Sequence, residues 1–200
     1  MSSGEGKEGK PKKVEPEDLL EMQKELNAGY ISLEDLRRAG NLPPDEIVEK
    51  GIPVPVFDCL ENIPCTPCHD VCPTGAVVME TMNDKPKVIW EKCTGCTLCA
   101  QACPGLAITI VYPKFGEKRL KGKRPDAEKL WLVSIPYEML PIPKKGEKVK
   151  VYDRGHRYLC DGEVYTVIKS PRFGTVLVNV LVPGECAFEA KYVEVMRDEQ

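Results

Sequence analysis

The sequence predicts an α+β fold in which a cysteine-rich segment lies between an N-terminal helical arm and a small β-barrel or sandwich. Three observations lead to this fold class. Eight of the ten cysteines fall between positions 59 and 103. Apolar residues before them recur at helical spacing, and valine-rich runs after them alternate and are separated by turn residues. We therefore expect four parts: a disordered tail (1–13), a helical arm (14–51), a cysteine-rich domain (52–140) and a small all-β domain (141–200).

The N-terminal parts contain no cysteine. Residues 1–13 consist mainly of Gly, Ser, Lys and Glu, a composition typical of disorder. Apolar residues between positions 19 and 26 predict a first helix of the arm. Ser32 and Asp35 resemble a capping box, which predicts a short helix ending at Gly40, and Pro43-Pro44 begins another turn. We interpret 14–51 as a brace or docking arm.

Short apolar runs in the cysteine-rich domain predict strands at 54–57, 77–82, 87–90 and 107–112. Asn83-Asp84 predicts the turn of a hairpin between the second and third of these strands. Short helices are expected after Cys72-Pro73 and over about 97–103. Residues 113–130 are expected to form a basic loop with seven basic and three acidic residues, followed by a strand at 131–135.

The final segment has the pattern of a small β-barrel or sandwich. Its valine-rich runs lie at 149–151, 164–168, 176–182 and 193–195. Turn residues separate these runs at Gly155, Asp161-Gly162, Gly174 and Pro183-Gly184.

The cysteines form two runs that both end in Cys-Pro. The second run reads C-x2-C-x2-C-x3-C-P and consists of Cys93, Cys96, Cys99 and Cys103. This spacing is typical of proteins that wrap a loop around a cubane iron–sulfur cluster. The first run consists of Cys59, Cys65, Cys68 and Cys72 and begins with the longer spacing C-x5-C. Two runs predict two [4Fe-4S] clusters and therefore single-electron transfer.

With these motifs, residues 52–112 resemble the bacterial two-[4Fe-4S] ferredoxins. The resemblance implies a ferredoxin-like two-cluster domain in which the fourth cysteine of each run binds the other cluster. It assigns cluster 1 to Cys59, Cys65, Cys68 and Cys103, and cluster 2 to Cys93, Cys96, Cys99 and Cys72. The chain departs from the family at Asn62, where the first cysteine of the run is usual. We expect Cys59 to bind with three added residues looped out; a three-iron cluster or another ligand is the alternative.

Other interpretations of the cysteines are weaker. Cys65-Thr-Pro-Cys68-His69 matches a haem attachment string, but the second run lacks the histidine. A zinc site from two Cys-x2-Cys pairs would leave several cysteines unexplained. We expect His69 to lie at the surface near a cluster. Cys160 and Cys186 are expected to be separate buried structural thiols without a companion.

The sequence predicts no catalytic site. It has no glycine-rich nucleotide motif and no triad or paired carboxylates. About 50 residues precede the cluster segment and nearly 90 follow it, more than a free ferredoxin needs. We therefore expect an electron-transfer subunit of a hetero-oligomeric oxidoreductase. By resemblance, such subunits serve flavin-dependent dehydrogenases, including amino-acid dehydrogenase complexes, or molybdenum and tungsten enzymes. We favour a partner that carries FAD or FMN.

Two alternatives belong to other classes. The chain would otherwise be a freely diffusing ferredoxin with appended domains, or a nucleic-acid-binding protein with a structural cluster. The basic loop motivates the second, but residues 14–70, with thirteen acidic and four basic residues, oppose it, so we expect no nucleic acid. The sequence has no apolar leader and no apolar run of 18 residues. We therefore expect no transmembrane segment and a cytoplasmic location. Because the expected clusters are sensitive to oxygen, we expect an anaerobic or microaerobic setting.

Overall fold

The computed structural model describes residues 29–196. The expected disordered tail and the expected helix between positions 19 and 26 lie outside the described residues. The chain divides into two compact units, 1–30 and 31–200, and the description below concerns the second.

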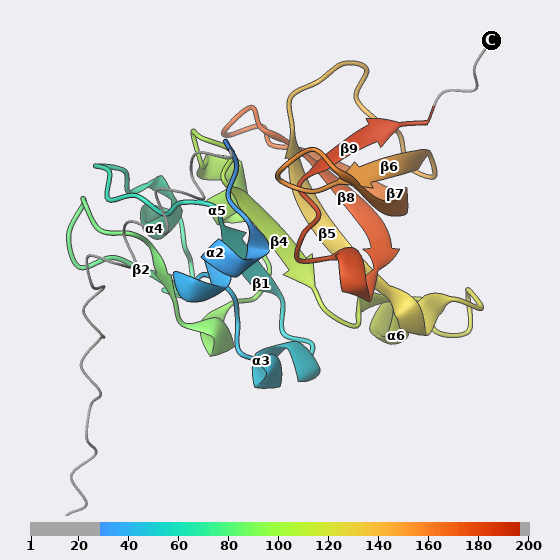
Figure 1. Ribbon diagram of the computed structural model, residues 1–200, viewed down its shortest axis with the longest axis horizontal. Coiled ribbons are helices and arrows are strands. Elements are labelled where there is room, and N and C mark those ends of the chain that lie inside the picture. Colours follow the sequence, from blue (N-terminus) through green and yellow to red (C-terminus); the bar gives the residue numbers. More distant parts are fainter. Residues whose placement is uncertain (1–28, 197–200) are drawn as a thin grey trace, which may run out of the picture. The chain divides into compact units, whose positions relative to one another are not determined.

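The second unit is built on one antiparallel sheet in the order β1-β4-β5-β8-β7-β6-β9 (Figure 1). Its strands are β1 (Val54–Phe57), β4 (Ile108–Tyr112), β5 (Leu130–Tyr137), β6 (Lys148–Tyr152), β7 (Tyr158–Lys169), β8 (Val176–Pro183) and β9 (Tyr192–Val195). A separate hairpin pairs β2 (Val77–Val78) with β3 (Lys87–Val88). The combination of a sheet with helices confirms that the fold is of mixed α and β type.

The helices are short. The α-helices are α2 (Leu33–Arg38), α3 (Asp45–Glu49), α4 (Pro67–Asp70), α5 (Leu98–Ala102) and α6 (Phe115–Arg119). Three 3₁₀ turns are η1 (Trp90–Lys92), η2 (Ala127–Lys129) and η3 (Gly184–Cys186). The capping box at α2 is confirmed: the Asp35 N–H donates to Ser32 Oγ at 3.1 Å, and the Ser32 N–H donates to Asp35 Oδ2 at 2.7 Å.

Strand β5 joins segments that the sequence places in different domains. It pairs with β4 on one side, with Ile110 opposite Ser134, and with β8 on the other, with Val133 opposite Val180. Most of β5 is buried, so both of its edges need partners whose backbone groups satisfy its own. The residues expected in domains 52–140 and 141–200 therefore contribute to one sheet.

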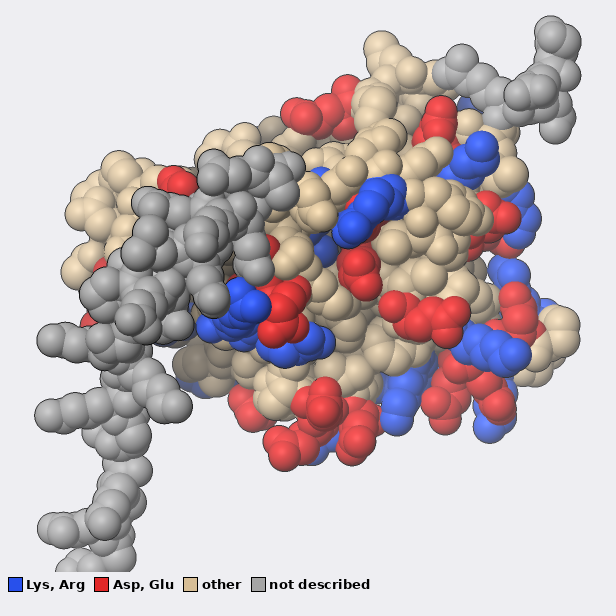
Figure 2. Space-filling view, in the orientation of Figure 1, with Lys and Arg blue, Asp and Glu red and all other residues tan. Residues whose placement is uncertain are grey.

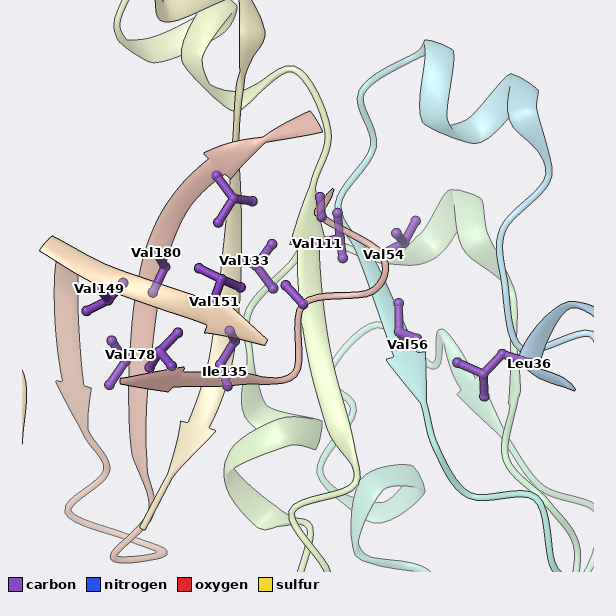
Figure 3. Packing of buried hydrophobic residues seen from close by; sticks show 14 of the residues in the cluster. Leu36, Val54, Val56, Val111, Val133, Ile135, Val149, Val151, Val178 and Val180 are labelled. Atoms are coloured by element: carbon purple, nitrogen blue, oxygen red, sulfur yellow. The ribbon is translucent and has the colours of Figure 1, made fainter. Parts of the chain in front are cut away.

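One apolar core extends along this sheet. Figure 3 shows members of the cluster, including Leu36 of α2, Val54 of β1, Val133 of β5 and Val151 of β6. The alternation of β6 explains its part in the core, because Val149 and Val151 are buried while Lys148 and Lys150 are exposed. Segments far apart in the sequence thus share one hydrophobic contact surface.

Several local predictions are wrong. The strands expected at 77–82 and 87–90 extend only over Val77–Val78 and Lys87–Val88. Asp161-Gly162 lies inside β7 instead of forming a turn. A Cβ at Gly162 would lie 2.6 Å from Val180 Cγ1 and 3.0 Å from Val151 Cγ2, so this glycine permits close strand packing. The helix expected after Cys72-Pro73 lies before it, as α4. Cys72 precedes a proline and therefore disfavours helical angles, so α4 ends before it. After Pro73 the chain turns at Gly75, whose φ is 61°, and no helix begins there.

Candidate metal centre

Four thiols line one pocket at the end of β1. The pocket contains Cys59, which follows β1, Cys65 and Cys68 at α4, and Cys103, which follows α5. Burial first, and then the neighbouring Cys103 and Cys65, raise the pKa of the Cys68 thiol to about 12. Burial also raises the pKa of Cys59, with the same two thiols contributing. These four residues are those expected for cluster 1.

A second group of thiols consists of Cys93 and Cys96 in the loop before α5, Cys99 within α5, and Cys72, which follows α4. Burial raises the pKa of Cys93 the most, and Cys96 and Cys72 also raise it. The pKa of Cys99 is raised by burial first and then by Cys93 and Cys96. The structure thus brings together the four residues expected for cluster 2. Cys68 also acts on Cys99, so the two groups adjoin.

The chemistry of both groups fits an iron–sulfur cluster. Thiolates are the ligands of such clusters, and burial opposes ionisation by raising the pKa of Cys59, Cys68, Cys93 and Cys99. Iron, when bound, would compensate the negative charge of the thiolates, and its binding would release their protons. Among residues 29–196, no three His, Cys, Asp or Glu side chains are grouped as a site for a single metal ion. A cubane distributes its thiolates over separate iron atoms, so its ligands need not meet at one point.

The two Cys-Pro turns have the same local structure. The Ala76 N–H donates to Cys72 Sγ at 3.2 Å, and the Ala107 N–H donates to Cys103 Sγ at 3.4 Å. The third residue after each cysteine has a positive φ, 61° at Gly75 and 49° at Leu106. Burial acts to raise the pKa of Cys72, but hydrogen bonds from Val77, Thr74 and Ala76 outweigh it and lower the pKa. Each turn therefore presents a backbone donor to the fourth thiol of its run.

Glycine is required in the loop of the second run. Gly95 has a φ of 69°, and a Cβ there would lie 2.6 Å from Pro53 Cβ and 2.7 Å from Tyr112 Cε1. The Tyr112 hydroxyl donates to the Gly95 carbonyl at 2.5 Å. This contact holds the loop of Cys93 and Cys96 against the sheet.

Cys59 lines the pocket of the first thiol group, whereas Asn62 does not. The Asn41 Nδ2 donates to the carbonyl of Phe57 at 2.8 Å and more weakly to that of Cys59 at 3.4 Å, so a residue after α2 holds the chain at this point. Residues 61–64 are exposed. This placement agrees with added residues looped out between Cys59 and Cys65, and the ligand role of Cys59 stays a prediction.

Cys160 and Cys186 are not separate, so the expectation that they lack a companion is wrong. Burial raises the pKa of Cys160, and a hydrogen bond with Cys186 raises it further. Strand β8 pairs antiparallel with β7, and Cys186 ends the 3₁₀ turn that follows β8. Counting outward from the turn at Gly174 would have placed the two residues near each other.

His69 is exposed, and its Nδ1 lies 3.0 Å from the carbonyl oxygen of Val77. The sequence predicts an exposed position for this residue, and the structure confirms it. The contact with Val77 accounts for the position of the imidazole ring without a contact between the ring and a thiol.

The basic segment 113–130 contains α6 and η2, and it uses part of its charge internally. Lys118 Nζ donates to the carbonyl of Gly51 at 2.7 Å, and Lys114 Nζ donates to that of Glu49 at 2.7 Å. Arg124 pairs with Glu163 at 3.0 Å. Figure 2 shows basic side chains lying among acidic ones on this face. The segment therefore joins elements of the fold as well as facing solvent.

Sequence reasoning missed three charged residues beside the first thiol group. Asp58 lies between Arg154 and Lys191, at 2.7 and 2.8 Å. No local sequence motif indicates these contacts, because the two basic residues are far from Asp58 in the chain.

In the part of the chain that the structure describes, no helix is long and apolar enough to cross a membrane.

Comparisons with known proteins agree with the thiol geometry. The family described as 4Fe-4S dicluster domain matches residues 63–119. Pyruvate synthase subunit PorD of Methanocaldococcus jannaschii is 37% identical over 57 residues, which cover 28% of this chain and 65% of that protein. Ferredoxin-type protein NapF of Haemophilus influenzae is 37% identical over 54 residues, or 26% of this chain and 31% of that protein. No solved structure matches.

An uncharacterized ferredoxin of M. jannaschii is 40% identical over 60 residues, or 30% of this chain and 36% of that protein. The chain thus spans between about a third and two thirds of the length of these relatives. The matches confirm the resemblance of this segment to ferredoxin-type 4Fe-4S proteins. The family match begins at Ile63 and leaves out Cys59.

Proposed function

We propose that this chain, whose residues 63–119 match a ferredoxin-type 4Fe-4S domain, is an electron-transfer subunit that holds two [4Fe-4S] clusters. Cys59, Cys65, Cys68 and Cys103 would hold cluster 1. Cys93, Cys96, Cys99 and Cys72 would hold cluster 2. The observation that carries the proposal is the gathering of eight thiols into two adjoining groups, each completed by a cysteine of the other run. When bound, such clusters supply single-electron transfer.

The crossed ligand sets can be tested by single substitutions. In protein prepared anaerobically, iron and sulfide should each be found at about eight per chain, as two cubanes require. Cys68→Ala and Cys103→Ala should remove the same EPR signal, while Cys99→Ala and Cys72→Ala should remove the other. Cys59→Ala should behave like Cys68→Ala, and Cys160→Ala is the control that keeps both signals. Loss of the Cys99-dependent signal in Cys103→Ala would refute the crossing.

The proposed partner is a catalytic subunit of a larger oxidoreductase. PorD is by name a subunit of pyruvate synthase, which supports a multi-subunit assembly. We favour a partner with FAD or FMN, as in amino-acid dehydrogenase complexes, because a flavin converts two-electron chemistry into single electrons. The similarity to PorD makes a pyruvate synthase the second candidate partner.

In this proposal the parts of the chain have different tasks. Residues 52–140 carry the clusters, and residues 141–200 form a small barrel-like β part that covers the catalytic subunit. Residues 31–51, which contain α2 and α3, brace the cluster segment. The assembly lies in an anaerobic cytoplasm.

Anaerobic purification from the native host tests the assembly. The chain should elute as part of a complex, and the co-purified subunit should contain flavin. Elution of the whole native pool near the monomer mass of 22.3 kDa would instead favour a freely diffusing ferredoxin. A partner that lacks flavin and converts pyruvate would favour the pyruvate synthase alternative.

A further inference from the structure

Three charged side chains form a buried network beside Cys59. Arg154 Nε contacts Asp58 Oδ1 at 2.7 Å, and Lys191 Nζ contacts Asp58 Oδ2 at 2.8 Å. The side chains of Asp58, Arg154 and Lys191 are 12%, 7% and 11% exposed. Charges this shielded from water interact strongly with their neighbours and are little screened by salt.

Lys191 also contacts the turn that ends the second cysteine run. Its Nζ donates to the carbonyl oxygen of Leu106 at 3.1 Å. The N–H of the same peptide unit belongs to Ala107, and it donates to Cys103 Sγ at 3.4 Å. A peptide unit is planar, with its C=O and N–H pointing in opposite directions. A cation at the oxygen polarises the unit and strengthens the N–H as a donor.

The network therefore lies next to two of the residues proposed to hold cluster 1, Cys59 and Cys103. Asp58 directly precedes Cys59, and its negative charge acts on that thiol. The Asp58 N–H also donates to the Ala107 carbonyl at 2.9 Å, so the carboxylate and the Cys103 turn are held together. Among the described residues, Lys191 Nζ contacts Asp58 and Leu106, and it makes no hydrogen bond to the matching Cys72 turn. The two otherwise similar turns differ in this contact.

We propose that Lys191 is a positioning residue that raises the reduction potential of cluster 1 and leaves that of cluster 2 unchanged. The inference rests on the proposed ligand sets. Reduction adds one negative charge to a cluster, so a nearby cation favours it and an unpaired carboxylate opposes it. Lys191 acts in both ways, because it neutralises Asp58 and polarises the peptide unit that donates to Cys103.

The test is an anaerobic EPR-monitored redox titration of the complete iron-loaded protein. Lys191→Gln removes the cation and leaves Asp58 with Arg154 alone. The potential of the signal that depends on Cys103 should fall, and the potential of the signal that depends on Cys99 should stay. Asp58→Asn removes the anion, so the potential of cluster 1 should rise. Lys191→Arg keeps the charge and should restore most of the wild-type potential.

Lys148→Gln is the matched control. Lys148 contacts Glu163 at 2.8 Å with a side chain that is 61% exposed, so its removal changes the net charge equally without touching the network. Both potentials should remain those of the wild type. If Lys191→Gln fails to load iron, the opposite shift in Asp58→Asn still tests the proposal.

Three outcomes distinguish this inference from the proposed function. Unchanged potentials in both Lys191→Gln and Asp58→Asn, with two clusters present, would overturn the inference alone. Equal shifts of both clusters would also overturn it, because the effect would then not be local to cluster 1. A wild-type protein that holds fewer than two clusters would overturn the proposed ligand sets instead.

Discussion

At the scale of single residues, the missing side chain of Gly162 shapes the sheet. Strand β7 passes between β6 and β8, and a Cβ at this position would meet valines of both neighbours. The atoms nearest to that Cβ are methyl groups of buried side chains, which have little room to move. The glycine is thus a packing requirement and not a turn signal.

Gly162→Ala should therefore destabilise the protein, by about 1–3 kcal/mol as is typical of overpacked cores. Equilibrium unfolding in urea measures the change in free energy. Gly105→Ala is the control, since a Cβ there would meet nothing within 4 Å. Equal stability of the two variants would show that β6 and β8 can move apart freely.

Prediction from sequence succeeded where a residue's role depends on its neighbours along the chain. The capping box at Ser32 and the spacing of Cys93, Cys96 and Cys99 are local patterns. The role of Gly162 depends on strand pairing, which the local pattern does not encode, and the Cys160–Cys186 pair emerges only when the β7–β8 register is counted from the turn at Gly174. The contacts of Asp58 with Arg154 and Lys191 span 96 and 133 residues, so no local motif could predict them.

At the scale of elements, Glu163 links β7 to its surroundings. It contacts Lys148 of β6 at 2.8 Å and Arg124 of the segment between α6 and η2 at 3.0 Å. The hydrogen bond from Lys148 is the main cause that lowers the pKa of Glu163, burial opposes it, and Arg124 lowers the pKa further. The carboxylate therefore stabilises the folded state in its ionised form.

This shift gives a pH dependence with a definite sign. A carboxyl group whose pKa is lower in the folded state stabilises the fold above its unfolded pKa, about 4.3 for Glu. That contribution is lost as the pH falls through the folded value. Glu163→Gln should lower stability at pH 7 and should flatten the loss of stability in acid. Urea unfolding between pH 3 and 7 checks this, and a wild-type and a variant curve that run parallel would refute it.

The strands were easier to predict than the helices for a physical reason. Strands β4, β5 and β8 are marked by long apolar runs, because they are buried in the middle of the sheet. Helices α4 and α5 have four and five residues, too few for an apolar stripe to show. The cysteine spacing placed α5 correctly, whereas α4 lies before Cys72-Pro73 and not after it.

At the scale of the whole molecule, regular structure is distributed unevenly. Strands β5, β7 and β8 carry long ladders, whereas β2 and β3 have two residues each. The thiol groups thus lie in a segment with few backbone ladders of its own. Bound clusters would supply cross-links there that the backbone does not.

Removal of the clusters should therefore have a local effect. After anaerobic chelation of iron, amide hydrogen exchange should become faster between residues 59 and 106, and β5, β7 and β8 should stay protected. Cys160→Ala, treated in the same way, should give the same pattern because it removes no proposed ligand. Uniform loss of protection would contradict the prediction and would mean that the clusters hold the whole sheet together.

The pairing of β5 with both β4 and β8 has a practical consequence for anyone who wishes to isolate the ferredoxin-type part. A chain cut after residue 140 would keep β5 but lose β8. The backbone N–H and C=O groups on one edge of the eight-residue, mostly apolar strand Leu130–Tyr137 would then be unpaired. Such an edge recruits strands from other molecules. A fragment that looks self-sufficient by its cysteines would aggregate, and solubility would return only with residues 141–200.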